Sequence, residues 1–160
     1  MVFSSLTFLY AYLPVVLVVY YLVPLRWRNA VLFLVSLFFY GWGEPRYVFV
    51  MLGSIFLNWQ GGLRIEKAMN QKDAAAAKRI LTSLIVINLV ILGIFKYADF
   101  VIENLNHLGL SLAPLHLSLP IGISFYTFQA MSYPIDLYRG ETSAQHSFLK
   151  FGTYVTMFPQ

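Results

Sequence analysis

The sequence of 160 residues contains no cysteine and carries little charge. Without cysteine, these residues offer no disulfide framework and no thiolate chemistry. Only 11% of the residues are charged, whereas soluble domains average about 25%, and 59% are hydrophobic. Eleven tyrosines and fourteen phenylalanines fit the aromatic belts that mark membrane interfaces. We therefore expect an integral membrane protein.

Several kinds of functional motif are also missing. The sequence has no Gly-rich phosphate loop, no GxSxG elbow and no nucleic-acid signature. Its three histidines, His107, His116 and His146, follow no metal-ligand spacing, and we expect them in loops or at interfaces without a catalytic role. The sequence therefore predicts no metal site and no nucleic-acid partner.

Uncharged runs organise the chain into a single membrane domain, residues 1–160, built as an all-α polytopic helix bundle. The predicted spans are 7–23, 29–43, 47–63, 80–95 and 119–135, with the start of a sixth at 148–160. Positive charge follows the first run, at Arg26 and Arg28, which favours an uncleaved span over a signal peptide. The second run is short, since fifteen residues make about 22 Å of helix against roughly 30 Å of hydrocarbon.

Basic residues are unevenly distributed among the predicted loops. The segment 64–79 holds five of the eleven, and its alanines favour helix. If this segment is cytoplasmic, alternation of the spans places nine basic residues inside and two outside. We therefore predict a multi-pass protein with its N-terminus outside. The segment serves as a topology determinant, or alternatively as a docking surface for an acidic soluble partner.

The fifth span lies within "LPIGISFYTFQAMSYPIDLYRGE" (119–141), which combines an apolar run with many hydrogen-bonding groups. Steps of three and four residues place one set on a single helix face: Gly122, Tyr126, Gln129, Tyr133, Asp136 and Gly140. The opposite face carries residues that suit lipid or core packing: Ile121, Phe125, Phe128 and Leu137. Because hydrocarbon supplies no partners, we expect the polar face to point into the bundle.

Two interpretations of this polar face stay open. Its side chains either hold helices together or line a substrate path, and the candidates are Ser124, Tyr126, Gln129, Tyr133, Asp136 and Arg139. Asp136 and Arg139 are also placed to pair with each other, one turn apart. Elsewhere, Asn58 and Asn88 are expected to hydrogen-bond between helices, and Glu44 and Arg46 to form a solvated pair.

Several stretches carry a resemblance to a known family. They are "MVFSSLTFLYAYLPVVLVVYYLVP", "RNAVLFLVSLFFYGWGEPRYV", "FKYADF", and "LPIGISFYTFQAMSYPIDLYRGE" followed by "FGTYVTMFPQ". Together they resemble the N-terminal part of the membrane-bound O-acyltransferase family, in its bacterial alginate O-acetyltransferase branch. The resemblance covers essentially all 160 residues, and the block 119–140 is its most specific part. It implies many transmembrane helices around a central tunnel, in a bacterial inner membrane.

The resemblance also implies an activity. Members of this family pass an acyl group from a cytoplasmic donor to an acceptor on the outer side. We therefore expect an O-acyltransferase that places an acyl group, with acetyl favoured, on hydroxyls of an exported polysaccharide such as alginate. The implied donor is acetyl-CoA or an acyl carrier, and periplasmic acetylation proteins are implied partners besides the membrane lipid. No cofactor is implied.

The family's catalytic histidine lies further along the chain than residue 160. We therefore expect no catalytic residue among these 160, a membrane domain truncated at its C-terminus, and no activity from this segment alone. In this interpretation the polar face of the fifth span lines or braces the tunnel. Two rival interpretations are a small transporter or channel subunit, which also explains a proline and polar residues within a span, and a non-catalytic membrane scaffold.

Overall fold

The computed structural model describes residues 6–43, 45–107, 113 and 122–157. Within these ranges every regular element is a helix: η1 (Phe8–Tyr12), α1 (Leu13–Leu22), α2 (Arg28–Gly43), η2 (Pro45–Tyr47), α3 (Val48–Asn70), α4 (Ala74–His107), α5 (Ile123–Arg139) and α6 (Phe148–Thr156). Two of them, counting η2 with α3, are long and apolar enough to cross a membrane: Pro45–Asn70 and Ala74–His107. The predicted all-α membrane bundle is confirmed.

Helices occupy every predicted segment within the described ranges, and several run past their expected ends. α3 continues beyond residue 63 through basic residues, and α4 extends past 80–95 at both ends. The segment 64–79 is therefore two helix ends joined by a tight turn at 71–73. There the side chain of Asp73 accepts a hydrogen bond from the Ala76 N–H, at 2.9 Å, which starts α4. Residues 119–121 of the fifth predicted span lie outside the described residues.

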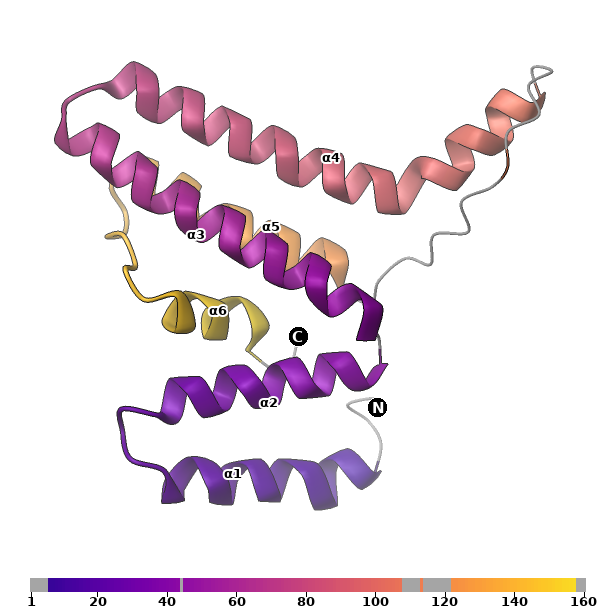
Figure 1. Cartoon of the computed structure of the whole chain (residues 1–160), viewed down its shortest axis with the longest axis vertical. Coiled ribbons are helices and arrows are strands. Elements are labelled where there is room, and N and C mark those ends of the chain that lie inside the picture. The colour runs from indigo at the N-terminus through magenta and orange to yellow at the C-terminus, as the bar shows by residue number, and fades with distance from the viewer. Residues whose placement is uncertain (1–5, 44, 108–112, 114–121, 158–160) are drawn as a thin grey trace.

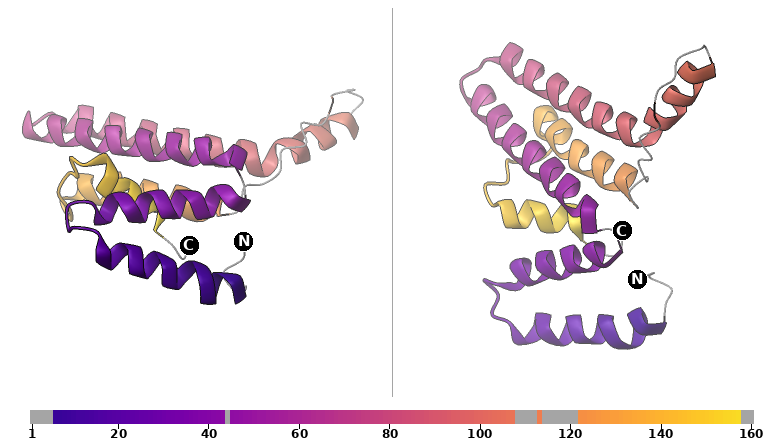
Figure 2. Two further views of the ribbon diagram at one scale, coloured as in Figure 1. Left: turned by 60° about the horizontal axis from the view of Figure 1, so that its bottom comes forward. Right: turned by 45° about the vertical axis from the view of Figure 1, so that its right-hand side comes forward.

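The helices are arranged in a fan (Figures 1 and 2). α3, α4 and α5 pack on one another as a three-helix group, and α3 and α5 also contact α6. α2 packs mainly on α6, and within the described part of the chain α1 reaches only η1 and α2. The most deeply buried apolar side chains lie in the three-helix group and on α6: Ile55, Ile65, Ile123 and Val155. The core therefore lies away from α1.

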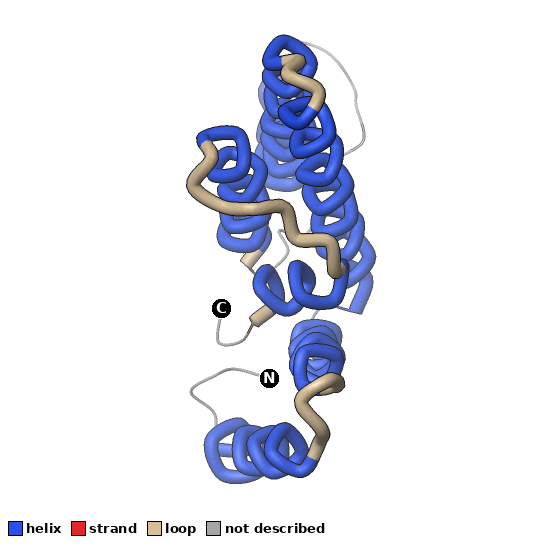
Figure 3. Tube along the Cα trace, turned by 90° about the vertical axis from the view of Figure 1, so that its left-hand side faces the viewer, coloured by secondary structure: helices blue, strands red, loops and turns tan. Residues whose placement is uncertain are grey.

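One end of the bundle gathers most of the positive charge. The α1–α2, α3–α4 and α5–α6 connections lie together at this end, which faces the viewer in Figure 3. These connections and the adjoining helix turns carry nine basic residues: Arg26, Arg28, Arg64, Lys67, Lys72, Lys78, Arg79, Arg139 and Lys150. The other two, Arg46 in η2 and Lys96 in α4, lie outside this group. We call this end of the bundle the basic end.

A buried pair of amides joins α3 to α4. Asn58 and Asn88 are 0% and 1% exposed, and each donates a side-chain N–H to the other's oxygen at 3.0 Å. Each uses its second N–H on its own helix: Asn58 bonds the Ser54 carbonyl at 2.9 Å and Asn88 bonds the Leu84 carbonyl at 2.8 Å. Both amide nitrogens are thus fully used, and the expected interhelical hydrogen bonding is confirmed.

Two adjacent glycines allow α3 to approach both of its partners. A Cβ atom at Gly61 would collide with the Leu84 side chain of α4, and one at Gly62 would collide with the ring of Tyr133 in α5. Small residues at such crossings let membrane helices gain van der Waals contact. The two glycines therefore set the spacing of the three-helix group.

Gly62→Ala is expected to destabilise the full-length protein by about 1–3 kcal/mol, because the added methyl group overpacks the contact with Tyr133. Gly53 lies in the same helix, and a Cβ there would meet nothing within 4 Å. Gly53→Ala should therefore be neutral or stabilise by about 0.5–1 kcal/mol. Thermal unfolding of both variants in detergent measures the difference, and equal effects would contradict the close crossing.

Replacing either asparagine of the pair by leucine is expected to cost about 1–3 kcal/mol, because the remaining amide loses a buried partner. The double variant Asn58→Leu/Asn88→Leu should lose less than the sum of the single losses, with a coupling energy of about 1 kcal/mol. Unfolding measurements on the four proteins complete this cycle. Strictly additive losses would show that the two amides do not stabilise each other.

Candidate functional site

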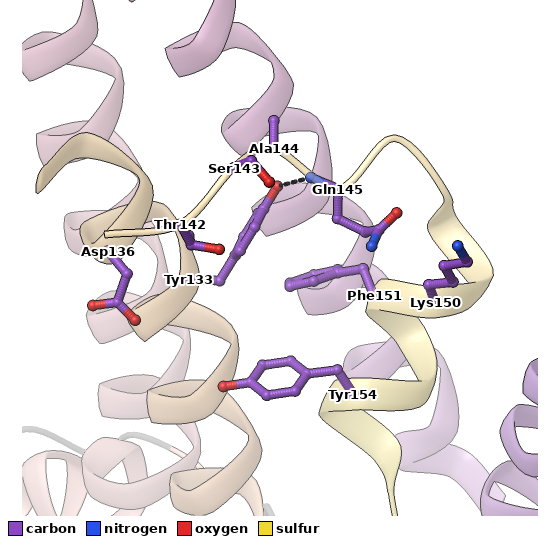
Figure 4. Close-up of a pocket in the computed structure, with 9 residues that line it drawn as sticks. All are labelled: Tyr133, Asp136, Thr142, Ser143, Ala144, Gln145, Lys150, Phe151 and Tyr154. Atoms are coloured by element: carbon purple, nitrogen blue, oxygen red, sulfur yellow. Dashed lines mark hydrogen bonds between the residues drawn. The ribbon is translucent and has the colours of Figure 1, made fainter. Parts of the chain in front are cut away.

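A pocket of about 390 Å³ opens at the basic end, between the last turns of α5, the connection at 140–147 and α6. We call it the loop pocket. Figure 4 shows its lining: Tyr133, Asp136, Thr142, Ser143, Ala144, Gln145, Lys150, Phe151 and Tyr154. A carboxylate, an ammonium group, an amide and several hydroxyls thus surround one space. Such a lining suits a polar or charged group better than an acyl chain.

Glycine and serine fix the two ends of the connection. Gly140 has a φ of 79°, in the left-handed region, and terminates α5. Its N–H bonds the Leu137 carbonyl at 3.1 Å, and the Glu141 N–H bonds the Asp136 carbonyl at 2.9 Å, which is the Schellman pattern. Ser147 begins α6, where its hydroxyl accepts from the Lys150 N–H at 3.4 Å. The sharp turn after α5 brings the chain back over the pocket.

Gln145 joins this connection to two neighbouring helices by hydrogen bonds. Its backbone N–H donates to the Tyr133 hydroxyl at 2.9 Å, and its carbonyl accepts from the Trp59 indole N–H at 2.8 Å. Nearby, His146 lies 3.4 Å from the Glu66 carboxylate. The connection is therefore fastened to α5 through Tyr133 and to α3 through Trp59 and Glu66.

Tyr133 also forms one wall of the pocket. Its side chain is 8% exposed, it packs over Gly62 of α3, and its ring centroid lies 4.6 Å from that of Phe151 in α6. The ring is held on two sides while the hydroxyl reaches the connection. Tyr133 of α5 therefore contacts α3 and α6 and also determines the shape of the pocket.

The other predicted site residues lie at different depths along α5. Tyr126 is 4% exposed and meets the Tyr40 ring of α2 edge-on, with 6.2 Å between centroids. Gln129 is half-buried and donates to the Tyr154 carbonyl of α6 at 2.7 Å. Of the six candidates, Tyr133 and Asp136 reach the loop pocket. Gln129 and Tyr133 brace neighbouring elements; the tunnel-lining role stays a prediction.

The ends of α5 differ from simple expectations. Ser124 is half-buried in its first turn. Arg139 is exposed and lies 4.0 Å from Glu141, so the suggested pairing with Asp136 is wrong. The reason is geometric, since the turn at Gly140 brings the Glu141 side chain within reach of Arg139.

The opposite face of α5 points outward over part of its length. Phe125 is 75% exposed and Phe128 is 51% exposed, as suits a lipid-facing surface, whereas Leu137 is buried in the core. Ile121 lies outside the described residues, as do His116 and Glu44. The two histidines within the described ranges, His107 and His146, are both exposed, at the end of α4 and in the connection after Gly140.

Comparison with known proteins gives a consistent set of relatives. The chain is 43% identical to "Probable alginate O-acetylase AlgI" of Pseudomonas aeruginosa, covering 99% of this chain and 31% of that protein. The protein of the same name from Azotobacter vinelandii is 41% identical, with 99% and 32% covered. "Peptidoglycan O-acetyltransferase" of Helicobacter pylori is 35% identical, with 87% and 27% covered. No protein-family model and no solved structure matches the chain.

The resemblance to the alginate O-acetylase branch of the membrane-bound O-acyltransferases is confirmed. The chain spans about a third of the length of these curated acetylase relatives. The identity extends along nearly the whole chain, so both the basic end and α5 belong to the region shared with the acetylases.

Most of the pocket that this acetylase-like chain forms was not predicted from its sequence. The unpredicted lining comes from the connection and from α6: Thr142, Ser143, Ala144, Gln145, Lys150, Phe151 and Tyr154. One local signal was present, because Ser147 is a good helix N-cap and Lys150, Phe151 and Tyr154 then share a helix face. The helix that packs against this face is determined by the tertiary fold, and no local sequence pattern predicts it.

Tyr133→Phe is expected to speed hydrogen exchange of the Gln145 amide by about threefold to tenfold, because one hydrogen bond that closes the connection is lost. Tyr154→Phe is the matched control: it changes the same kind of side chain in the same pocket, and the Tyr154 hydroxyl bonds no described residue. Exchange of residues 140–147 followed by mass spectrometry tests this. Equal protection in both variants would refute the fastening role of Tyr133.

Proposed function

We propose that this protein is an O-acyltransferase of the bacterial inner membrane that transfers acetyl groups to hydroxyls of an exported polysaccharide such as alginate. The observation that supports this is the 43% identity, over 99% of the chain, to a protein named as an alginate O-acetylase. The Helicobacter pylori relative, named for peptidoglycan, supports an exported bacterial polysaccharide as the broader acceptor class. These names favour an enzyme over a transporter or a scaffold.

In this proposal the basic end faces the cytoplasm and the N-terminus lies outside. The nine basic residues at that end, against two elsewhere, support this orientation, because Lys and Arg are retained on the cytoplasmic side of membrane proteins. The charge also assists the donor, since acetyl-CoA and phosphopantetheine-bearing acyl carriers are both anionic. Electrostatic attraction of this kind raises the local concentration of an oppositely charged substrate.

The loop pocket is the donor-side entrance in this proposal. It opens at the basic end, and Lys150 supplies a cation beside hydroxyl and amide groups that hydrogen-bond a polar ligand. Tyr133 at the pocket, then Gln129 and Tyr126, follow one face of α5 towards its start. Polar side chains along this face give the acyl group a route between helices that hydrocarbon does not fill.

The chemistry itself requires a further group. Attack by a hydroxyl on an acyl carbonyl requires a base near the attacking oxygen and a donor for the developing oxyanion. The two histidines that the structure describes, His107 and His146, are exposed, and neither lines the loop pocket. We therefore assign the base to the part of the full-length protein beyond these residues, and assign to this region the binding and guidance of the donor. Periplasmic acetylation proteins are the proposed partners on the acceptor side.

The full-length protein is expected to restore O-acetyl groups to alginate in a strain lacking its own alginate O-acetylase. In that strain Ser143→Trp should lower the acetyl content by about fivefold or more, because the indole fills the loop pocket. Glu141→Trp, in the same connection but outside the pocket lining, is the control and should retain activity. Proton NMR of the purified polymer measures both.

Two outcomes of this experiment separate the parts of the proposal. No restoration by the correctly inserted wild-type protein would reject the alginate acetylase assignment. Restoration by wild type and by Ser143→Trp alike would retain the enzyme assignment and reject the loop pocket as the donor entrance. Membrane levels of each variant, measured by immunoblot, normalise the acetyl content.

A further inference from the structure

A second hollow lies on the outer face of α4, apart from the loop pocket. It is a shallow groove of about 800 Å³, lined by Ala75, Lys78, Arg79, Thr82, Ser83, Val86 and Ile87. We call it the α4 groove. All of its lining residues belong to α4, so the groove opens away from α3 and α5.

The lining changes from charged to apolar along the helix. After Ala75 in the first turn of α4 come Lys78 and Arg79, which belong to the basic end; two hydroxyl residues follow one turn later, and Val86 and Ile87 follow another turn on. The distance from Lys78 to Val86 along the axis is about 12 Å, from a rise of about 1.5 Å per residue. A phospholipid passes from phosphate through ester groups to hydrocarbon over a comparable distance at a bilayer surface.

The two cations are not neutralised by carboxylates of the described chain. Neither Lys78 nor Arg79 forms an ion pair there; Arg79 uses one N–H on the Ala75 carbonyl, at 3.4 Å. The remaining guanidinium N–H groups and the lysine ammonium are thus available to an anion. Arg and Lys near a membrane surface attract anionic lipid by about 1 kcal/mol each.

The hydroxyl residues of the groove are compatible with contact to lipid. Thr82 donates to the Lys78 carbonyl and Ser83 to the Arg79 carbonyl, both at 2.9 Å. Their protons are satisfied within the helix, so contact with lipid leaves no donor unpaired. Past the groove the exposed surface of α4 remains apolar, since Leu89, Val90 and Ile94 are all exposed.

We propose that the α4 groove binds an anionic glycerophospholipid. The phosphate lies against Lys78 and Arg79, and the acyl chains lie along Val86 and Ile87. Charge complementarity selects an anionic headgroup, and the aliphatic half of the groove selects a lipid over a soluble anion. The site lies on a different face from the loop pocket, since the two share no lining residue. It does not depend on the acyltransferase assignment.

Native mass spectrometry of the full-length protein tests this with two added lipids, phosphatidylglycerol and phosphatidylcholine, that carry the same acyl chains. The first phosphatidylglycerol should bind about tenfold more tightly than phosphatidylcholine. Lys78→Gln/Arg79→Gln should remove that preference. Arg64→Gln/Lys67→Gln is the matched control, because it removes two exposed cations from the same end of the bundle outside the groove, and it should keep the preference.

Three other results would each contradict the proposal. If the wild-type protein does not discriminate between the two lipids, the site is not selective for anionic lipid and the proposal is wrong. If both double variants weaken phosphatidylglycerol equally, the general charge of the basic end, and not the groove, attracts the lipid. If protein elsewhere in the full-length chain covers the groove, Lys78 and Arg79 will resist labelling by soluble amine and guanidine reagents, and the proposal fails.

Discussion

Hydrocarbon offers no hydrogen-bond partner, and this constraint accounts for several of the specific contacts that join the helices of this chain. A polar side chain within such a helix must find its partner in protein. Asn58 and Asn88 do so across α3 and α4. The Tyr12 hydroxyl does so on the Val35 carbonyl, at 2.7 Å, between η1 and α2, and Gln129 does so on α6. These bonds are individually modest, about 1 kcal/mol each, but each is specific for one helix pair.

α6 packs between α2 on one side and α3 and α5 on the other. On one side Thr153 places its hydroxyl 2.9 Å from the Asn29 carbonyl of α2, and Gly152 admits the ring of Phe33. On the other side Phe151 packs on Tyr133 of α5. A helix of nine residues therefore connects the pair α1–α2 to the three-helix group. Its position also closes the loop pocket, so the same packing that builds the fold creates the candidate site.

The sequence predicted what depends on local pattern and missed what depends on tertiary contact. Uncharged runs located the helices, and the period of α5 correctly placed Tyr126 and Tyr133 inward and Phe125 outward. Helix ends were less well predicted. α3 and α4 both extend into the charged segment 64–79, where alanines favour helix and Asp73 caps the start of α4. The fastening of Gln145 was beyond prediction, since Trp59 lies 86 positions away in the chain and no spacing rule joins them.

The two interpretations of the α5 face, helix bracing and substrate lining, turn out to be compatible. The Tyr133 ring braces α3 and α6, and its hydroxyl fixes the connection that forms the pocket wall. Near the basic end water is available, so Asp136 and Lys150 need no protein partner and are left facing the pocket. Deeper in the bundle Gln129 of the same face donates to the Tyr154 carbonyl and braces α6. The change in solvent along α5 therefore accounts for interhelical bracing deeper in the bundle and for polar side chains that line a pocket at the basic end.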